Sequence, residues 1–271
     1  MIQRKLLLVG AGHLGQRVGM LWLGRHHNAQ VLAETQTERT HMTLHDQGMS
    51  PRLRSDPPPQ PCPWVVFAVP PSSSEDYAEE ARRTVSLWDR RSDGEGALVM
   101  TSSTGVYLHS DGEPCVESSP VADHARARRI LDAEAVILDA GGCVVRLAGL
   151  YNQDRGPHRV YMRNTTSERR PDGFINLIHY QDAAQLVVAT LEHGTSAAIY
   201  MGCDDHPTTR TQLVDEALAS PRYQTLEGVQ RCTFTGTSGP LGRICDSSIT
   251  RRALEWSPRW ATFSAWAQTE G

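Results

Sequence analysis

The sequence predicts an α/β fold with a doubly wound parallel sheet, on three observations. A strand-like run, Lys5–Val9, passes directly into the glycine-rich segment 10–15 and then into a segment with helical apolar spacing. Further short apolar runs alternate with helical patterns along the chain, which is the order of a parallel sheet covered by helices. The 271 residues suffice for one large α/β domain with a smaller lobe.

The segment 10–15 reads Gly-Ala-Gly-His-Leu-Gly, a G-x-G-x-x-G motif between a strand and a helix. Such a motif places a dinucleotide pyrophosphate against a helix N-terminus. Gly10 permits the turn, Gly12 leaves room for phosphates, and Gly15 lets the helix pack closely on the strand. With His13 and Leu14 these glycines form the predicted Rossmann-type contacts to NAD or NADP. The alternative is an ordinary βα turn that is rich in glycine.

The second strand is expected at Ala29–Ala33, and Glu34 follows it. An acidic residue about 20 positions beyond the glycines normally accepts hydrogen bonds from the adenosine ribose. Glu34 therefore favours NAD, because a carboxylate there repels a 2′-phosphate. Arg39 lies a few residues further on and leaves NADP open, since it could bind that phosphate. The structural alternative for Glu34 is an exposed carboxylate at a strand end.

The next buried strand is expected at Trp64–Val69, and two prolines end it. Ligands of doubly wound sheets bind at the carboxyl ends of the strands. We therefore expect Ala68, Val69 and Pro70 to contact the cofactor. Segment 74–76, Ser-Glu-Asp, has the composition of a helix start.

A further strand, Ala97–Met100, runs into Thr-Ser-Ser-Thr-Gly-Val-Tyr at 101–107. This Ser-Ser-x-x-Val-Tyr pattern resembles the extended short-chain dehydrogenase/reductase family, which includes NAD-dependent sugar-nucleotide epimerases and dehydratases. Further matches to that family follow in the same order and cover nearly the whole chain. They lie at 144–151, 155–157, 176–184 and 252–258, the last with Glu255 where glycine is usual.

The resemblance implies catalysis by a serine, a tyrosine and a lysine, in which the tyrosine exchanges a proton with the substrate oxygen. Ser103 occupies the serine position, and Ser102 beside it is a predicted cofactor contact. The Y-x-x-x-K pair is absent from segment 122–134, where a register on Glu134 places Arg126 and Ile130 at the two positions.

Three interpretations of that departure stay open. In the first, the protein is an oxidoreductase or an epimerase/dehydratase-like enzyme in which Ser103, Tyr107 or His124 supplies the proton. In the second, it binds NAD(P) without catalysis, as a regulatory or assembly protein. In the third, the cleft binds another ligand or a protein partner. Ser103 and Tyr107 are the predicted catalytic residues, and Arg126 could bind an acidic substrate or phosphates.

The domain boundary is expected near residue 150. Residues 1–150 form the NAD(P)-binding core in this prediction, and residues 151–271 complete the sheet and form a small substrate lobe. We expect a small-molecule substrate that is acidic or sugar-like. A homodimer is an expectation from the family resemblance only.

Composition argues against several other classes of protein. The formal net charge of −4 does not suggest nucleic-acid binding, and no apolar run approaches the length of a membrane span. Six cysteines without a C-x-x-C pair indicate a reducing compartment, so we expect a cytoplasmic protein. No metal-ligand spacing is evident, and His179 with Asp182 is interpreted as a helix entry stabilised by Asp182.

Overall fold

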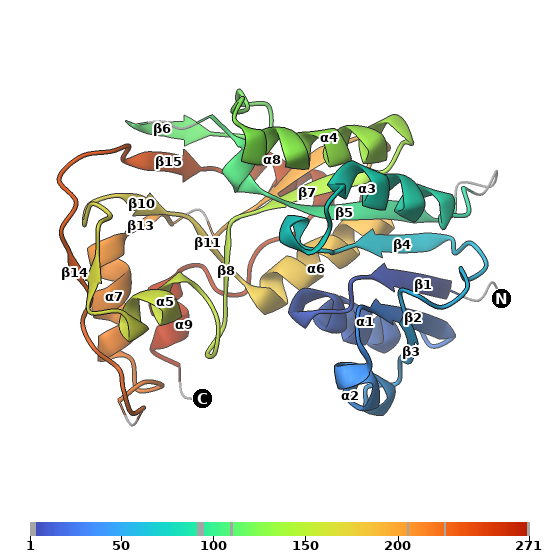
Figure 1. Ribbon diagram of the computed structural model, residues 1–271, viewed down its shortest axis with the longest axis horizontal. Helices are drawn as coiled ribbons and strands as arrows, with labels where there is room; N and C mark the ends of the chain where they lie inside the picture. The colour runs from blue at the N-terminus through green and yellow to red at the C-terminus, as the bar shows by residue number, and fades with distance from the viewer. Residues whose placement is uncertain (1–3, 91–94, 109–110, 205, 225, 270–271) are drawn as a thin grey trace.

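The computed structural model describes residues 4–90, 95–108, 111–204, 206–224 and 226–269 (Figure 1). Its centre is a seven-stranded sheet in the order β12-β7-β5-β4-β1-β2-β3, in which neighbouring strands are parallel. The strands are β1 (Arg4–Val9), β2 (Ala29–Thr35), β3 (Ser50–Leu53), β4 (Trp64–Phe67), β5 (Ala97–Ser103), β7 (Cys143–Leu147) and β12 (Ile199–Gly202). The predicted α/β, doubly wound fold is confirmed.

Helices cover both faces of this sheet. On one face lie α1 (His13–Arg25) and α6 (Tyr180–His193), and on the other lie α3 (Tyr77–Ser86) and α4 (Ala125–Asp139). Side chains of β1 alternate between these two cores, because successive strand residues point to opposite faces. Leu6 and Leu8 pack in the core beneath α1 and α6, whereas Leu7 and Val9 pack beneath α3 and α4.

The strand order reverses at β1, which has β2 on one side and β4 on the other. In open parallel sheets a crevice forms at the carboxyl edge of such a reversal. Helix α3 begins just beyond this edge, where the Asp76 carboxylate caps it by accepting from the Glu79 N–H at 2.9 Å. The start expected at 74–76 is therefore correct to within a residue or two.

Beyond the carboxyl edge of the sheet lies a smaller lobe with its own core (Figure 1). Tyr151, Met162, Leu213, Phe263 and Trp266 are among its buried residues. Its helices are α5 (Pro157–Arg163), α7 (Arg210–Ala219) and α9 (Phe263–Ala267). Three pairs of short strands form separate two-stranded sheets: β8 (Gly149–Tyr151) with β11 (Leu177–His179), β9 (Thr166–Ser167) with β14 (Thr233–Phe234), and β10 (Phe174–Ile175) with β13 (Thr208–Thr209).

The remaining elements are short. A two-stranded sheet pairs β6 (Asp111–Cys115) with β15 (Gly242–Cys245) in parallel. Helix α2 (His41–Asp46) lies between β2 and β3 in the chain, and helix α8 (Ser248–Leu254) follows β15. Three single-turn 3₁₀ helices are η1 (Glu38–Thr40), η2 (Pro71–Ser73) and η3 (Thr104–Val106). No helix in these described ranges is long and apolar enough to span a bilayer.

Helix α6 begins where the sequence predicted, directly after His179, and His179 itself is the capping residue. The helix cap is His179, whose Nδ1 accepts from the Gln181 N–H at 3.2 Å. Asp182 is fully buried and accepts from the backbone N–H groups of Arg259 at 2.9 Å and Trp260 at 3.2 Å. Asp182 lies in the first turn of α6, as expected, and its carboxylate in addition holds the C-terminal segment.

A buried ion pair joins α4 to the sheet. Arg146 on β7 donates to Glu134 from Nη2 at 2.6 Å and from Nε at 3.1 Å, and both side chains are at most 5% exposed. Ser102 also donates its hydroxyl proton to Glu134, and the Tyr107 ring lies 4.7 Å from the Arg146 guanidinium carbon. Since each charge needs the other to offset its loss of hydration, removal of one partner leaves an unpaired buried charge.

We predict that Arg146→Ala lowers the free energy of unfolding by about 3–5 kcal/mol, because it strands the Glu134 carboxylate in the core. Arg128→Ala is the matched control, since Arg128 pairs with Asp123 on the surface with side-chain exposures of 61% and 81%. That control should cost less than about 1 kcal/mol in the same chemical denaturation experiment. Equal losses in the two variants would contradict the structural role of the buried pair.

A buried histidine lies in the core of the smaller lobe. His158 is 0% exposed, and its ring lies 5.0 Å from that of Phe263. Its Nε2 shares a 2.8 Å hydrogen bond with the hydroxyl of Tyr223. Burial lowers the pKa of His158 from 6.5 to about 3, because the charged imidazolium would be poorly solvated there. The ring is therefore neutral in the folded protein at pH 5, where the unfolded chain protonates it.

This difference predicts a pH-dependent stability. The contribution of His158 is complete above pH 6.5 and declines as the pH falls toward 3, because the unfolded state binds the additional proton. Between pH 7 and pH 5 the loss should be about 2 kcal/mol. Denaturation of His158→Gln at both pH values should show that much less pH dependence than the native chain. His45→Gln, at a residue whose side chain is 80% exposed, serves as the control, and an unchanged pH dependence in His158→Gln would refute the assignment.

Candidate functional site

The turn after β1 has the geometry that its glycines predict. Gly10 has a φ of +98°, and a Cβ there would lie 2.7 Å from the carbonyl oxygen of Ala68. A Cβ on Gly15 would lie 2.6 Å from the carbonyl oxygen of Gly10. Both positions therefore require glycine for the fold itself, one for backbone conformation and one for close packing of α1.

Gly12 differs from the other two glycines. No atom lies within 4 Å of a Cβ built on Gly12, so the space beside it is open. Gly12 is also the N-cap of α1 and offers no side chain to the first N–H groups of the helix. Those N–H groups and the positive end of the helix dipole face this open space, which is the arrangement that binds phosphate.

The open space belongs to a cleft of about 580 Å³ at the carboxyl edge of the sheet. The structure brings every predicted cofactor contact to its wall: Gly10, Gly12, His13, Leu14, Gly15, Glu34, Ala68, Val69, Pro70 and Ser102. They come from the ends of β1, β2, β4 and β5 and from the start of α1. Their contact with a nucleotide stays a prediction, but their convergence on one cleft is an observation.

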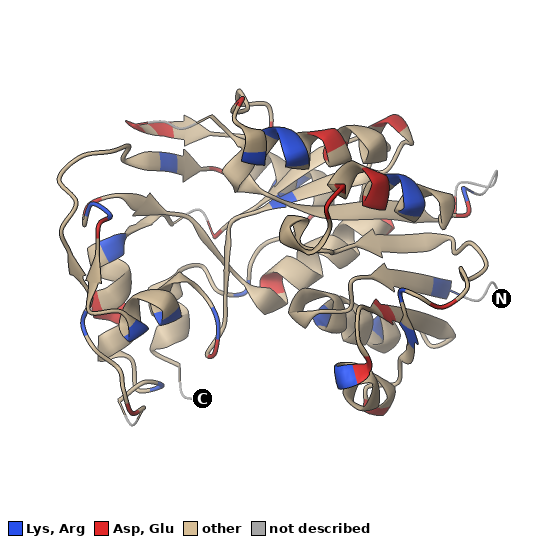
Figure 2. Cartoon of the chain, in the orientation of Figure 1, with Lys and Arg blue, Asp and Glu red and all other residues tan. Residues whose placement is uncertain are grey.

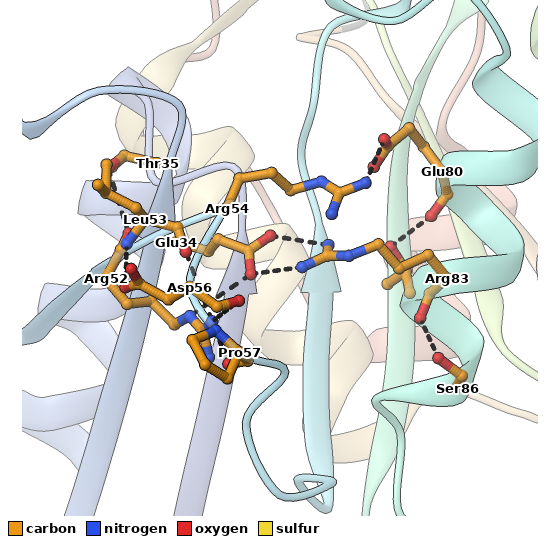
Figure 3. A network of polar contacts seen from close by, with 11 residues as sticks. Glu34, Thr35, Arg52, Leu53, Arg54, Asp56, Pro57, Glu80, Arg83 and Ser86 are labelled. Atoms are coloured by element: carbon orange, nitrogen blue, oxygen red, sulfur yellow. Dashed lines mark hydrogen bonds and ion pairs between the residues drawn. The ribbon is translucent and has the colours of Figure 1, made fainter.

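At the β2 end of the cleft the Glu34 carboxylate is already paired. Arg83 on α3 donates from Nη1 at 2.8 Å and from Nη2 at 2.7 Å, and Arg52 Nε lies 3.6 Å from Oε2 (Figure 3). The Glu34 side chain is 2% exposed. Its backbone carbonyl accepts from the N–H groups of Gly10 at 3.2 Å and Ala11 at 2.8 Å. The structure thus places this carboxylate against arginine, where the sequence had suggested a free ribose contact.

The two predicted catalytic residues lie in different surroundings. Ser103 lines the cleft, and its Oγ accepts from the Gly105 N–H at 3.0 Å. Tyr107 does not line the cleft, is 1% exposed, and donates its hydroxyl proton to the Glu117 carbonyl at 3.1 Å. Burial raises the pKa of Tyr107 above its usual value. The structure therefore places Ser103 within reach of a ligand and Tyr107 in the core.

Helix α4 turns an apolar side chain toward the cleft. Ile130, which the register on Glu134 puts at the lysine position, is a lining residue. Arg126, at the tyrosine position, is exposed and does not line the cleft. His124 is the N-cap of α4, and its Nδ1 accepts from the Ala127 N–H at 3.1 Å. A capping role accounts for His124 without catalysis.

Two tyrosines in the cleft were not singled out by the sequence. The Tyr77 hydroxyl donates to the Val69 carbonyl at 2.8 Å, so it is committed to the wall. Tyr180 is half-buried, and the Arg17 guanidinium carbon lies 5.3 Å from its ring. Within the described ranges its hydroxyl makes no hydrogen bond. Its place directly after β11, at a strand end, was the available signal.

The charges on the molecule are mixed. Figure 2 shows basic and acidic residues interspersed over both parts of the chain. Around the cleft the basic lining residues are Arg39 and Arg54 near β2 and β3, and Arg155 beside the smaller lobe. In the part of the chain that the structure describes, no group of three or more His, Cys, Asp or Glu residues could hold a metal ion.

Solved structures with the same fold include sugar-nucleotide enzymes. A functionally unknown conserved protein from Silicibacter pomeroyi is 18% identical, with a TM-score of 0.78 over 96% of this chain and 95% of its own. A dTDP-glucose 4,6-dehydratase from Bacillus anthracis in complex with NAD is 13% identical, with a TM-score of 0.76 over 98% and 94%. A UDP-glucuronic acid 4-epimerase from Bacillus cereus in complex with NAD is 12% identical, with a TM-score of 0.73 over 97% of both chains.

These likenesses show that the chain has the fold of NAD-dependent epimerases and dehydratases, the fold that the motifs in the sequence predicted. No protein-family model matches the sequence, and no curated protein matches it.

The glycine geometry gives a paired prediction. Gly10→Ala should lower the free energy of unfolding by about 2 kcal/mol or more, because its Cβ meets backbone atoms at a positive φ. Gly12→Ala should stay within about 1 kcal/mol of the native protein, since its backbone suits alanine and the space is open. Thermal or chemical denaturation of both variants tests this. Equal destabilisation would show that the cleft beside Gly12 is not open in solution.

Proposed function

We propose that this protein binds NAD(P)(H) in the cleft and uses it in an oxidoreductase or epimerase/dehydratase type of reaction with a non-standard active site. One observation carries the proposal: the uncapped start of α1 and the open space at Gly12 face the cleft where the strand order reverses. That combination supplies N–H donors and a positive dipole end for a pyrophosphate.

The remaining cleft wall supports a substrate beside the nicotinamide end. Ser103, Tyr180 and Arg155 lie on this wall, the last beside the smaller lobe. We propose Ser103 as the group that hydrogen-bonds the reacting oxygen and the Tyr180 hydroxyl as the proton donor. The guanidinium of Arg155 suits a small acidic or sugar-phosphate substrate. In this proposal residues 151–271 supply the substrate lobe to the nucleotide-binding core of residues 1–150.

A second candidate function is non-catalytic NAD(P) binding in a regulatory or assembly protein. Ile130 favours it, because an aliphatic side chain lines the cleft where the family resemblance calls for lysine. Such a side chain can neither anchor a ribose hydroxyl nor lower the pKa of a neighbouring tyrosine. The homodimer and the cytoplasmic location expected from the sequence stay predictions.

A fluorescence titration with NADH and NADPH tests nucleotide binding directly. We predict saturable binding of at least one of them by the native chain and a loss of at least tenfold in affinity in Gly12→Asp, because the new carboxylate would occupy the phosphate position with like charge. Asp123→Asn, on the surface, controls for the general effect of a charge change. No binding of either nucleotide would refute the proposed function.

A substrate panel separates the two candidates. Protein loaded with nucleotide is incubated with sugar nucleotides and small hydroxy acids, and both the absorbance of the reduced nicotinamide and the chromatographic profile of the products are followed, because an epimerase or dehydratase returns its hydride to the substrate. Catalysis predicts conversion with at least one compound and a loss of about 10²-fold or more in Ser103→Ala or Tyr180→Phe. Nucleotide binding without conversion of any compound supports the regulatory or assembly function instead.

A further inference from the structure

The β2 end of the cleft bears on the choice between NAD and NADP, and the argument rests on the proposed function. A dinucleotide with its pyrophosphate at Gly12 places its adenosine ribose at the end of β2. The lining residues there are Thr35, Gln36, Thr37, Arg39, Thr40 and Arg54. These side chains are hydroxyls, an amide and two guanidinium groups, and the one carboxylate among the neighbouring lining residues is that of Glu34.

Glu34 does not offer the acceptor that an NAD site uses. Both of its oxygens accept from the Arg83 fork, and its side chain is almost completely buried (Figure 3). Arg52 adds a second guanidinium 3.6 Å away. A carboxylate held this way is neutralised, so it neither attracts a ribose 2′-hydroxyl strongly nor repels a phosphate there.

Two arginines at the β2 end of the cleft, Arg39 and Arg54, have guanidinium N–H donors that can bind a ligand. Arg39 on η1 is exposed on the cleft wall and makes no hydrogen bond or ion pair within the described ranges. Arg54, directly after β3, donates from Nη2 to Glu80 at 2.7 Å and is 36% exposed (Figure 3). A guanidinium carries five N–H donors, so this single bond to Glu80 leaves most of the Arg54 fork for another anion.

The local charge balance favours an anionic ligand. Four guanidinium groups gather here, those of Arg39, Arg52, Arg54 and Arg83. Two carboxylates pair with them, those of Glu34 and Glu80. Arg52, Arg83 and Glu80 lie behind the cleft wall, as do Glu38 and Asp56, whose carboxylate accepts from the Leu53 N–H at 2.8 Å. On the cleft wall itself, Arg39 and Arg54 outnumber the single carboxylate of Glu34, and this excess of positive charge is the complement of a phosphate group, which arginine binds with well-aligned hydrogen bonds.

We propose that the site is selective for NADP(H), with the adenosine 2′-phosphate bound by Arg39 and Arg54. The ion pair between Glu34 and Arg83 makes this possible, because it withdraws the strand-end carboxylate from the ribose. The preference for NAD that Glu34 suggests in the sequence is thereby reversed. The Thr35 hydroxyl is not part of the phosphate site, because it bonds the Thr37 carbonyl at 3.0 Å.

The test compares nucleotides that differ only in the 2′-phosphate. NADPH should bind at least about tenfold more tightly than NADH, and 2′,5′-ADP should displace NADPH at least about tenfold better than 5′-AMP does. Arg39→Ala should weaken NADPH at least fivefold more than it weakens NADH, because the lost contact is to the 2′-phosphate alone. Arg252→Ala, an exposed arginine outside the cleft, should change neither affinity.

The Glu34→Gln variant separates the two assignments of Glu34. If its carboxylate holds the ribose of NADH, the affinity for NADH falls about tenfold. In our account the affinity for NADH does not fall, because the paired carboxylate makes no ribose contact, and the affinity for NADPH does not fall either, because Arg52 and Arg83 are freed to add to the positive charge. A melting temperature measured alongside shows that the variant is folded, and Arg39→Ala gives an independent result if it is not.

The outcomes also distinguish the two levels of the proposal. Tighter binding of NADH, or equal binding of the two nucleotides, overturns the selectivity and leaves NAD(P) binding intact. Displacement by 5′-AMP as effective as by 2′,5′-ADP overturns the phosphate site at Arg39 and Arg54. No binding of either dinucleotide overturns the proposed function and this inference together.

Discussion

The backbone hydrogen bonds from Gly10 and Ala11 to the carbonyl of Glu34 hold the candidate site together. They fix the turn after β1 to the end of β2, and the positive φ of Gly10 directs the chain into α1. Gly15 then packs on the carbonyl of Gly10, and the absence of a side chain at Gly15 lets α1 lie this close to the turn. Because these contacts use backbone atoms, they leave the space at Gly12 free for a ligand.

Glu34 also links the glycine turn to the opposite face of the sheet, where α3 packs. Side chains alternate along β2, so the Glu34 carboxylate points toward α3 while Ala33 packs beneath α1. There Arg83 meets it in a paired, buried contact. Glu34 thus supports the glycine turn through its backbone and sets the charge at the β2 end of the cleft through its side chain.

The sequence predicted the first βαβ unit well, because its signals are local. Strand, glycines and helix follow one another within 25 residues, so the G-x-G-x-x-G spacing and its flanking elements can be recognised without the rest of the chain. The carboxyl edges of β4 and β5 were likewise predictable from apolar runs that end in proline or serine. Such signals predicted the part of the cleft wall that the ends of β1, β4 and β5 form.

The remaining features depend on contacts between residues that are distant in the chain. Strand β3 was not expected, because Ser-Pro-Arg-Leu at 50–53 has no apolar run and lies at the sheet edge, where proline is tolerated. Arg83 lies 49 positions from Glu34, and the backbone partners of Asp182 lie 77 and 78 positions away. No local pattern in the sequence indicates such partners. The pairing of Glu34 with Arg83 at the β2 end of the cleft could therefore be found only from the three-dimensional structure.

Hydrogen exchange in the presence and absence of millimolar NADPH tests the central claim most directly. The account predicts slower exchange of backbone amides at 12–16, where α1 begins, and at 35–40 beside the ribose end, with little change in α7 and α9. Unchanged exchange at 12–16, or protection confined to another part of the chain, would contradict a dinucleotide site at the glycine turn.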